Sequence, residues 1–270
     1  MKRSPKRQAG WRPFPAVGIL VIGLVVSMAA CSVHQIPTAS GYNGPNYPTS
    51  LGPGDVAFVA LAARSSNVSD QFAAVLLKPV GRGTRITFSA GNWGGSAFIS
   101  NESYFTWTAD QGYPAGSVLE IFDNDPFPVT LFADGNAYDQ SSNLSSLSGT
   151  TFGLSKNGDN LFAYQGTRGN PVFLAGLIFG GNGQSLTWGG TDDSARIEAL
   201  PSSLVNGTTA NSLGGTYSFG YYDCTYLSTG TAAALDAAMN NPVHWTAKQD
   251  SSNQDLNQSG DVLICGIAPQ

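Results

Sequence analysis

Three aspartates in two neighbouring turns are the residues of this 270-residue chain whose types and spacing could best support binding or catalysis. Asp123 and Asp125 lie in Asp-Asn-Asp-Pro, and Asp134 lies in Ala-Asp-Gly-Asn. Carboxylate oxygens gathered in one turn region are typical ligands of Ca²⁺. Two loop carboxylates at the right separation also hydrolyse glycosidic bonds. Because turns select Asp, Asn and Gly anyway, a calcium site, a hydrolase site and simple solvated turns all remain open.

Nucleophilic catalysis has little support in the residue types. A Ser-His-Asp triad needs a histidine, and the body of the chain offers His244 beside Trp245, where a packed or helix-capping role is the simpler interpretation. No Gly-x-Ser-x-Gly motif occurs. One histidine cannot complete a zinc site if Cys224 and Cys265 pair with each other, as argued below. The residues therefore favour a protein that is not an enzyme, without deciding the matter.

Two tryptophans could bind a partner. Trp93 lies between glycines in Gly-Asn-Trp-Gly-Gly, and Trp107 lies in the apolar stretch Phe-Thr-Trp-Thr. Exposed aromatic rings stack on sugars or anchor protein partners. The alternative is that both rings cap the core, since large aromatic side chains are mostly buried.

The composition excludes several classes of protein. The chain is 41% apolar and only 11% charged, with 33 glycines, which argues against disorder and against a helical bundle. Eight cationic and 18 acidic side chains follow Cys31, giving those residues a net charge of −10. Nucleic-acid binding needs clustered Lys and Arg, so no nucleic-acid partner is expected.

The first 31 residues have the pattern of a targeting segment. A basic stretch is followed by an apolar run over residues 16–30, which is the length of a secretory segment and short for a membrane-spanning helix. The run ends at Met28-Ala29-Ala30-Cys31, which resembles a bacterial lipobox. The resemblance implies a signal peptide over 1–30 and acylation of Cys31, including palmitate, as the contact with the membrane. A plain signal peptide or an N-terminal anchor, with Cys31 as a spare thiol, is the alternative.

Residues 31–53 are rich in proline and glycine and have no apolar periodicity, so they are expected to form a flexible tether. Ser32 after the cysteine, by its resemblance to sorted lipoproteins, favours the outer membrane of the cell envelope. Residues 54–270 are expected to form one domain.

That domain is predicted to be mainly β. Short apolar or alternating runs separated by Gly, Asn and Asp clusters indicate a β-sandwich. One helix is predicted over 231–240, capped by Thr229 or Thr231, and a shorter one over 192–200. The predicted strands cover 55–62, 71–78, 84–89, 105–108, 117–122, 160–164, 172–179, 216–222 and 261–265.

Cys224 and Cys265 remain once Cys31 is assigned to lipid. Two cysteines in an exported chain most simply form a disulfide bond. Closing a loop of about 40 residues would stabilise the fold by roughly 4 kcal/mol. Two buried free thiols are the alternative.

Several stretches resemble a group of secreted bacterial β domains, including Gly54–Phe58, Gly83–Phe88 with Asn92-Trp93, and Asn241–Trp245. A second likeness, at Leu154–Leu161, is to the lamin-tail domain, an immunoglobulin-like sandwich. These resemblances imply a surface-displayed domain that interacts with a protein or glycan and carries no recognised catalytic residue. The expected function is therefore a lipid-anchored, non-catalytic envelope protein. A carbohydrate- or ester-active hydrolase and a purely structural envelope component are the alternatives.

Overall fold

The protein is mainly β, with 46% of the described residues in strands and 7% in helices. The chain divides into two units, residues 1–33 and residues 34–270. The first unit, with the expected signal peptide and Cys31, lies outside the described residues. Within the described ranges, no helix is long and apolar enough to cross a membrane. The computed structural model describes residues 44–64, 70–99, 104–122, 130–133, 136–138, 144–145, 152–181, 185–189, 197–249, 256 and 267–270.

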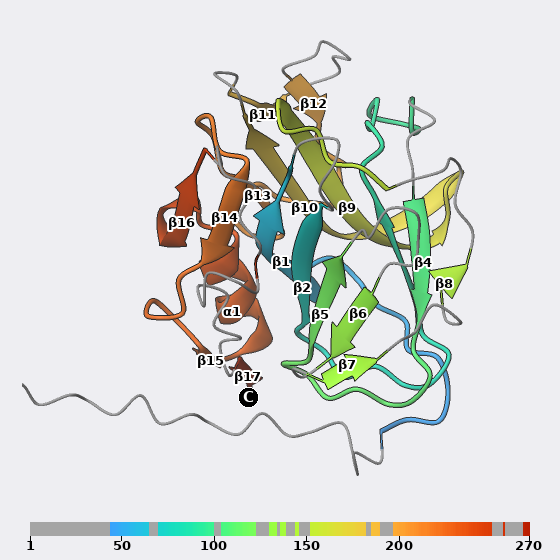
Figure 1. Ribbon diagram of the computed structural model, residues 1–270. Coiled ribbons are helices and arrows are strands. Elements are labelled where there is room, and N and C mark those ends of the chain that lie inside the picture. The colour runs from blue at the N-terminus through green and yellow to red at the C-terminus, as the bar shows by residue number, and fades with distance from the viewer. Residues whose placement is uncertain are drawn as a thin grey trace, which may run out of the picture. The chain divides into compact units, whose positions relative to one another are not determined.

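The larger of the two main sheets has seven strands, and each pairs antiparallel with its neighbours. Its centre is the pair β1–β2, which is joined to β14 on one side and to β5 on the other (Figure 1). Along the sheet the strands are β16 (Trp245–Lys248), β14 (Phe219–Tyr222), β1 (Val56–Ala62), β2 (Gln71–Leu76), β5 (Val118–Phe122), β6 (Thr130–Ala133) and β7 (Asn136–Tyr138).

The second main sheet has six strands and is built around one long hairpin of β9 and β10. Neighbouring strands in this sheet are antiparallel, except that β13 runs parallel to β10. Along the sheet the strands are β13 (Ala210–Ser212), β10 (Asn170–Gly180), β9 (Gly158–Thr167), β3 (Arg85–Ser89), β4 (Tyr104–Thr108) and β8 (Leu144–Ser145). Two small parallel pairs complete the strands: β11 (Thr187–Gly189) with β12 (Ile197–Ala199), and β15 (Thr229–Gly230) with β17 (Ala268–Pro269).

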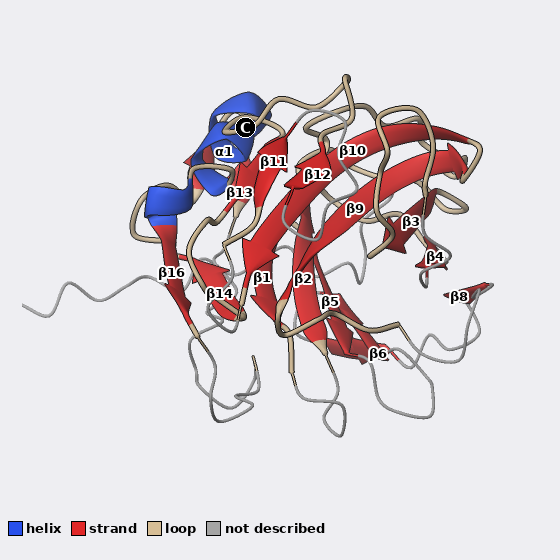
Figure 2. Cartoon of the chain, turned by 90° about the horizontal axis from the view of Figure 1, so that it is seen from above, coloured by secondary structure: helices blue, strands red, loops and turns tan. Residues whose placement is uncertain are grey.

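Seen from above, β9 and β10 of one main sheet lie next to β1 and β2 of the other (Figure 2). The two sheets share one hydrophobic core. Phe72 of β2 lies 5.3 Å from Phe88 of β3, ring centroid to ring centroid, so aromatic rings of one sheet contact those of the other. Phe58 of β1 and Phe105 of β4 extend the same group of rings. Aromatic pairs at these separations stabilise a core beyond the area that they bury.

One short helix, α1 (Ala232–Met239), packs beside β1 near the C-terminus. The side chain of Thr231 caps it by accepting the N–H of Ala234 at 3.2 Å. Of the two predicted caps, Thr229 and Thr231, the structure therefore has Thr231. Leu235 and Met239 are buried in the core shared by the sheets. The helix predicted over 231–240 is thus confirmed. Beyond its end, Pro242 begins the short 3₁₀ helix η2 (Pro242–His244).

The outcome for the other predicted elements is mixed. Every predicted strand from 55–62 to 216–222 coincides with a strand, while the predicted strand 261–265 lies outside the described residues. The helix predicted over 192–200 is wrong where the structure describes it. There Ile197–Ala199 forms β12 and pairs with β11, and Glu198 and Ala199 are buried. Pairing with β11 therefore overrides the local helical preference.

Candidate functional site

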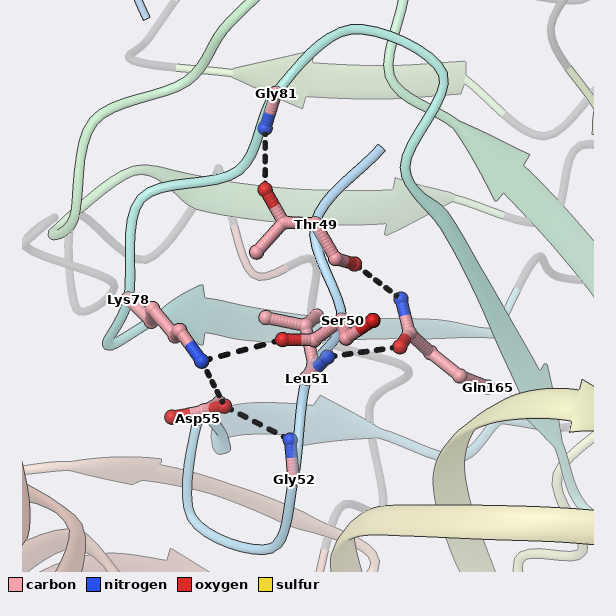
Figure 3. A network of polar contacts seen from close by, with 8 residues as sticks. All are labelled: Thr49, Ser50, Leu51, Gly52, Asp55, Lys78, Gly81 and Gln165. Carbon is pink, nitrogen blue, oxygen red and sulfur yellow. Dashed lines mark hydrogen bonds and ion pairs between the residues drawn. The ribbon is translucent and has the colours of Figure 1, made fainter. Parts of the chain in front are cut away.

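The chain enters the domain through a short segment that the domain holds in place (Figure 3). Gln165 of β9 forms two hydrogen bonds with it through its side-chain amide. Its Oε1 accepts the N–H of Leu51 at 2.9 Å, and its Nε2 donates to the carbonyl oxygen of Thr49 at 3.1 Å. Gln165 therefore binds the segment much as a neighbouring strand would. We call residues 45–52 and the side chains that hold them the N-terminal clasp.

The turn between β2 and β3 binds the other side of the clasp. The N–H of Gly81 donates to the hydroxyl of Thr49 at 2.9 Å, and the N–H of Thr49 donates to the hydroxyl of Thr84 at 2.8 Å. The N–H of Arg82 donates to the carbonyl oxygen of Pro45 at 3.1 Å. A side chain on Gly81 would collide with backbone of this segment, which explains the glycine at that position.

An ion pair closes the clasp at its C-terminal end. Lys78 Nζ donates to the carbonyl oxygen of Ser50 at 3.1 Å and to Asp55 Oδ2 at 3.2 Å. Asp55 Oδ2 also accepts the N–H of Gly52 at 2.8 Å. The pair is partly exposed, with 45% of the Lys78 side chain and 25% of the Asp55 side chain accessible, so its attraction contributes at most about 1 kcal/mol. Its main effect is to fix the direction of the chain at the start of β1.

These contacts differ from the expectation of a flexible tether over 31–53. The part of that stretch which the structure describes, residues 44–53, lies against the domain, and Leu51 is buried in the shared core. Proline and glycine prevent a helix or a strand here, but the backbone groups still bond to side chains far along the chain. Irregular backbone can be ordered when such partners satisfy its N–H and C=O groups.

A buried carboxyl lies beside Gly54, directly after the clasp. Asp236 of α1 is 3% exposed, and burial raises its pKa to about 8, with the charge of Asp55 adding to the rise. Asn240 acts in the opposite direction by donating from Nδ2 to Asp236 Oδ1 at 2.7 Å. Gly54, at φ +83°, leaves room for this carboxyl, because a Cβ there would come 2.5 Å from Asp236 Oδ2.

Two carboxyls and a raised pKa are the marks of an acid–base catalyst. Here the acid with the raised pKa is covered by protein, and the exposed partner, Asp55, is bound to Lys78 and Gly52. Asp236 has no face open to a substrate. The arrangement therefore gives this pair of carboxyls no access to a substrate.

The two tryptophans predicted as binding residues are both packed inside the protein, which corrects that prediction. Trp107 is fully buried beside Tyr113, at 5.3 Å between ring centroids. Trp93 is 7% exposed and packs edge-on against Phe98 and Phe173, at 5.3 and 4.8 Å. The alternative, that both rings cap the core, is the one that these contacts support.

Trp93 belongs to a second aromatic cluster on the face of β9 and β10 that points away from the shared core. Leu161 and Ala163 face the core, whereas the alternating residues Phe162 and Tyr164 join this cluster. Arg168 covers its edge, with the guanidinium 4.4 Å from the ring centre of Phe98. Burial raises the pKa of Tyr164 to about 12, while the positive charge of Arg168 opposes the rise. The cluster is therefore a covered structural element.

An aromatic pair near the C-terminal end of β14 is open to solvent. Tyr226 stacks on His244 with ring centroids 4.2 Å apart and planes 23° apart, and it is 54% exposed. His244 is fixed by a hydrogen bond of 2.8 Å between Nδ1 and the carbonyl oxygen of Ala238, which confirms its place at the helix end. Val243 beside it is 69% exposed. We call Tyr226, Val243, His244 and Asp223 the Tyr226 patch.

Asp223 gives the patch a carboxylate. Its Oδ1 accepts the N–H of Thr225 at 2.9 Å, and the backbone and side chain of Thr225 lower the pKa of Asp223 below its usual value. The N–H of Asp223 donates to the carbonyl oxygen of His244 at 2.8 Å, which ties the carboxylate to the stacked pair. A flat ring beside a charged acceptor suits a molecule with both an apolar face and hydroxyl groups.

The other predicted site residues are tested only in part. Asp123, Asp125, Asp134 and Cys265 lie outside the described residues, and so does Cys31. Among the residues that are described, no group of three or more His, Cys, Asp or Glu could hold a metal ion. Cys224 is disulfide-bonded, and both cysteines that could be its partner lie outside the described ranges. The Cys224–Cys265 bond and the calcium site stay predictions.

Comparison with known proteins identifies no relative. No protein family, no curated protein and no solved structure matches the chain.

Gln165, Asp236 and Tyr226 are site residues that the sequence alone did not single out. The only signal for Asp236 was its position beside Leu235 and Met239, on the apolar side of a predicted helix.

Proposed function

We propose that this chain is a lipid-anchored protein of the bacterial envelope that displays a non-catalytic β domain and binds a glycan or protein partner. The observation that carries the proposal is the N-terminal clasp. In such a protein the chain that comes from the anchor enters the domain at the clasp, where Gln165, Lys78 and Asp55 hold it. The lipobox-like Met28–Cys31 lies a short distance upstream.

The domain itself we infer to be an immunoglobulin-like or lamin-tail-like sandwich. Two largely antiparallel sheets around a common core support this inference. Domains of this architecture present loops and edge strands to partners without needing a catalytic centre.

The Tyr226 patch is the surface that we assign to the partner, and its chemistry favours a glycan. A sugar ring has apolar faces that stack on an aromatic ring, and its hydroxyls donate to a carboxylate. Tyr226 is already held in place by His244, so little conformational entropy is lost on binding. Asp223 supplies the acceptor.

Anchoring and binding are tested separately. We expect the protein to fractionate with membranes and the variant Cys31→Ser to become soluble; a membrane-bound Cys31→Ser protein would contradict lipid anchoring. On an array of envelope glycans, Tyr226→Ala should weaken binding about tenfold, the upper range for one aromatic contact. Val205→Ala, which removes an equally exposed apolar side chain outside the patch, should bind as the unchanged protein does.

A pull-down against envelope extract and an assay for glycan and ester turnover, run beside the array, discriminate between the alternatives. If the protein binds protein partners and gives no glycan signal, the Tyr226 patch would be assigned to a protein ligand. Turnover of a glycan or ester substrate would support a hydrolase using the loop carboxylates Asp123, Asp125 and Asp134. If no partner of either kind is bound, a purely structural envelope role would be favoured.

A further inference from the structure

The Tyr226 patch combines two groups that attract an organic cation. Tyr226 offers an aromatic ring that remains exposed although His244 stacks on it. Asp223 offers an ionised carboxylate, because hydrogen bonds from the backbone and side chain of Thr225 lower its pKa. The face of an aromatic ring attracts a cation through its quadrupole, and a carboxylate attracts one through its charge and its hydrogen bonds. The chemistry of the patch therefore extends beyond stacking on a neutral sugar.

One turn brings the two groups together. The carbonyl oxygen of Asp223 accepts the N–H of Tyr226 at 3.2 Å, which closes a four-residue turn with Asp223 at its first position and Tyr226 at its last. The Cα atoms at the two ends of such a turn lie within about 7 Å of each other. A ligand as small as one sugar residue can therefore reach both side chains.

The turn is fixed before any ligand binds. Cys224, at its second position, is disulfide-bonded. The N–H of Asp223 donates to the carbonyl oxygen of His244 at 2.8 Å, and the N–H of Thr225 donates to Asp223 Oδ1 at 2.9 Å. A site that is already ordered loses little conformational entropy when it binds.

No described cation pairs with Asp223. Within the described residues, both groups that bond to its carboxylate belong to Thr225, and both are uncharged. The sequence has no Lys or Arg between Arg196 and Lys248. Lys248 lies over the ring of Phe219, at the end of β14 opposite to Asp223. The charge of Asp223 is therefore available to a ligand.

The contacts of His244 are those of a neutral ring. Its Nδ1 lies 2.8 Å from the carbonyl oxygen of Ala238, so this nitrogen is a donor. Its Nε2 lies 3.5 Å from Asn241 Nδ2, and the other amide atom, Asn241 Oδ1, already accepts the N–H of Val243. Nε2 thus faces a donor and acts as an acceptor, as it does in the neutral imidazole. The formal charge of the patch is that of Asp223, minus one.

We propose, on the basis of the glycan binding inferred above, that the Tyr226 patch selects a glycan with a free amine, whose ammonium group binds Asp223 while the sugar ring stacks on Tyr226. The same charge disfavours uronic acids and phosphorylated sugars, because their anions would meet the carboxylate directly. The charge of the whole chain acts in the same direction, since eight cationic and 18 acidic residues follow Cys31.

Three tetrasaccharides that differ only in charge test the selection. They are cellotetraose and its two derivatives in which the primary alcohol groups are converted to amines or to carboxylates. Binding to the full mature protein in detergent is measured by calorimetry at about pH 7.5, where alkyl amines are protonated and carboxylates ionised. We expect the amine form to bind about fivefold more tightly than cellotetraose, and the carboxylate form about fivefold more weakly, as one exposed charge pair predicts. Higher salt should reduce both differences.

A neutral isostere provides the matched control. Asp223→Asn keeps the acceptor oxygen for the N–H of Thr225 and removes the charge, so the three sugars should then bind within about twofold of one another. Asp110→Asn makes the same change at another exposed carboxylate and should leave the preference for the amine intact.

The outcomes separate the amine selection from the glycan binding on which it depends. Equal binding of the three sugars, or a preference for the amine that survives Asp223→Asn, would overturn the selection and leave glycan binding standing. If none of the three binds, the selection is overturned, and the array of envelope glycans decides the proposed function by itself. Binding of a tetralysine peptide with none of the sugars bound would overturn the selection and assign the patch to a protein ligand.

Discussion

The side-chain amide of Gln165 holds the backbone of Leu51 across 114 positions of sequence, with 2.9 Å between the Leu51 nitrogen and Gln165 Oε1. The same amide group donates to the carbonyl oxygens of Thr49 and Arg85. One residue of β9 thus connects the incoming segment to β3. The segment before β1 is therefore part of the folded domain.

Replacing Gln165 tests this joint. Gln165→Ala removes three hydrogen bonds in a partly buried position and should lower the free energy of unfolding by about 2 kcal/mol. Gln165→Glu keeps the acceptor for Leu51 but loses the donor to Thr49 and Arg85 and sets a carboxylate oxygen against their carbonyl oxygens, so it should also destabilise the protein in chemical denaturation. Limited proteolysis within residues 44–52 should accelerate in both variants. Equal cleavage rates in the variants and the unchanged protein would show that the clasp does not hold the segment.

The buried carboxyl of Asp236 predicts a dependence of stability on pH. Its pKa is raised from 3.8 to about 8, so the folded state binds this proton more tightly than the unfolded state does. The stabilisation is complete below pH 3.8, declines as pH rises toward about 8, and is absent at higher pH. Asp236→Asn resembles the protonated acid, so the stability of this variant should not decline over that range. The free energy of unfolding of both proteins, measured by denaturation at about pH 5 and about pH 9, tests this.

Asp223→Asn is the control for that measurement, because the pKa of Asp223 is lowered and the sign is opposite. Its contribution is lost as pH falls, so Asp223→Asn should be less stable than the unchanged protein by a constant amount between about pH 5 and about pH 9, and the difference should disappear only on the acid side. An Asp236→Asn protein that loses stability with rising pH as steeply as the unchanged protein would refute the assignment to Asp236.

The shared core predicts a large effect at Phe72. Its ring contacts Phe88 and Phe105 of the opposite sheet, so Phe72→Ala should lower the free energy of unfolding by about 3 to 5 kcal/mol. Val172→Ala, at a half-exposed position of β10, should change it by no more than about 0.5 kcal/mol. Comparable losses in the two variants would contradict a core that joins the two sheets.

The disulfide prediction concerns the C-terminal region. Thr229 pairs with Ala268 in parallel register, so the stretch after Cys224 lies beside the stretch after Cys265. Peptide mapping without reductant should recover Cys224 and Cys265 in one linked pair. The double variant Cys224→Ser with Cys265→Ser should be less stable by roughly 4 kcal/mol, because closing a loop of about 40 residues restricts the unfolded chain. A free thiol at Cys265 would refute the pairing.

The strands were predictable where burial is local in the sequence. The apolar run of β1 and the alternation of β3 are visible in a single stretch of residues, and both strands are present. The clasp was not predictable, because its hydrogen bonds join a stretch without periodicity to Gln165. Likewise, β12 depends on pairing with β11, and no local pattern could distinguish it from a short helix.

For the candidate site too, residue types could be read from the sequence, whereas contacts between distant residues could not. Trp93 was noticed for its residue type, but only the rings of Phe98 and Phe173 show that it is covered. Tyr226 was overlooked because its exposure depends on stacking against His244, 18 positions away and on the far side of α1 in the sequence. Exposure of an aromatic ring is a property of the packed structure, and residue type alone does not reveal it.

Mass spectrometry of the mature N-terminal peptide tests the proposed anchoring most directly. We predict a peptide that begins at Cys31 and carries the mass of three acyl chains, followed by the unmodified residues of the segment leading to the clasp. A mature protein that retains residues before Cys31, or that begins at an unmodified Cys31, would contradict the lipid-anchored function.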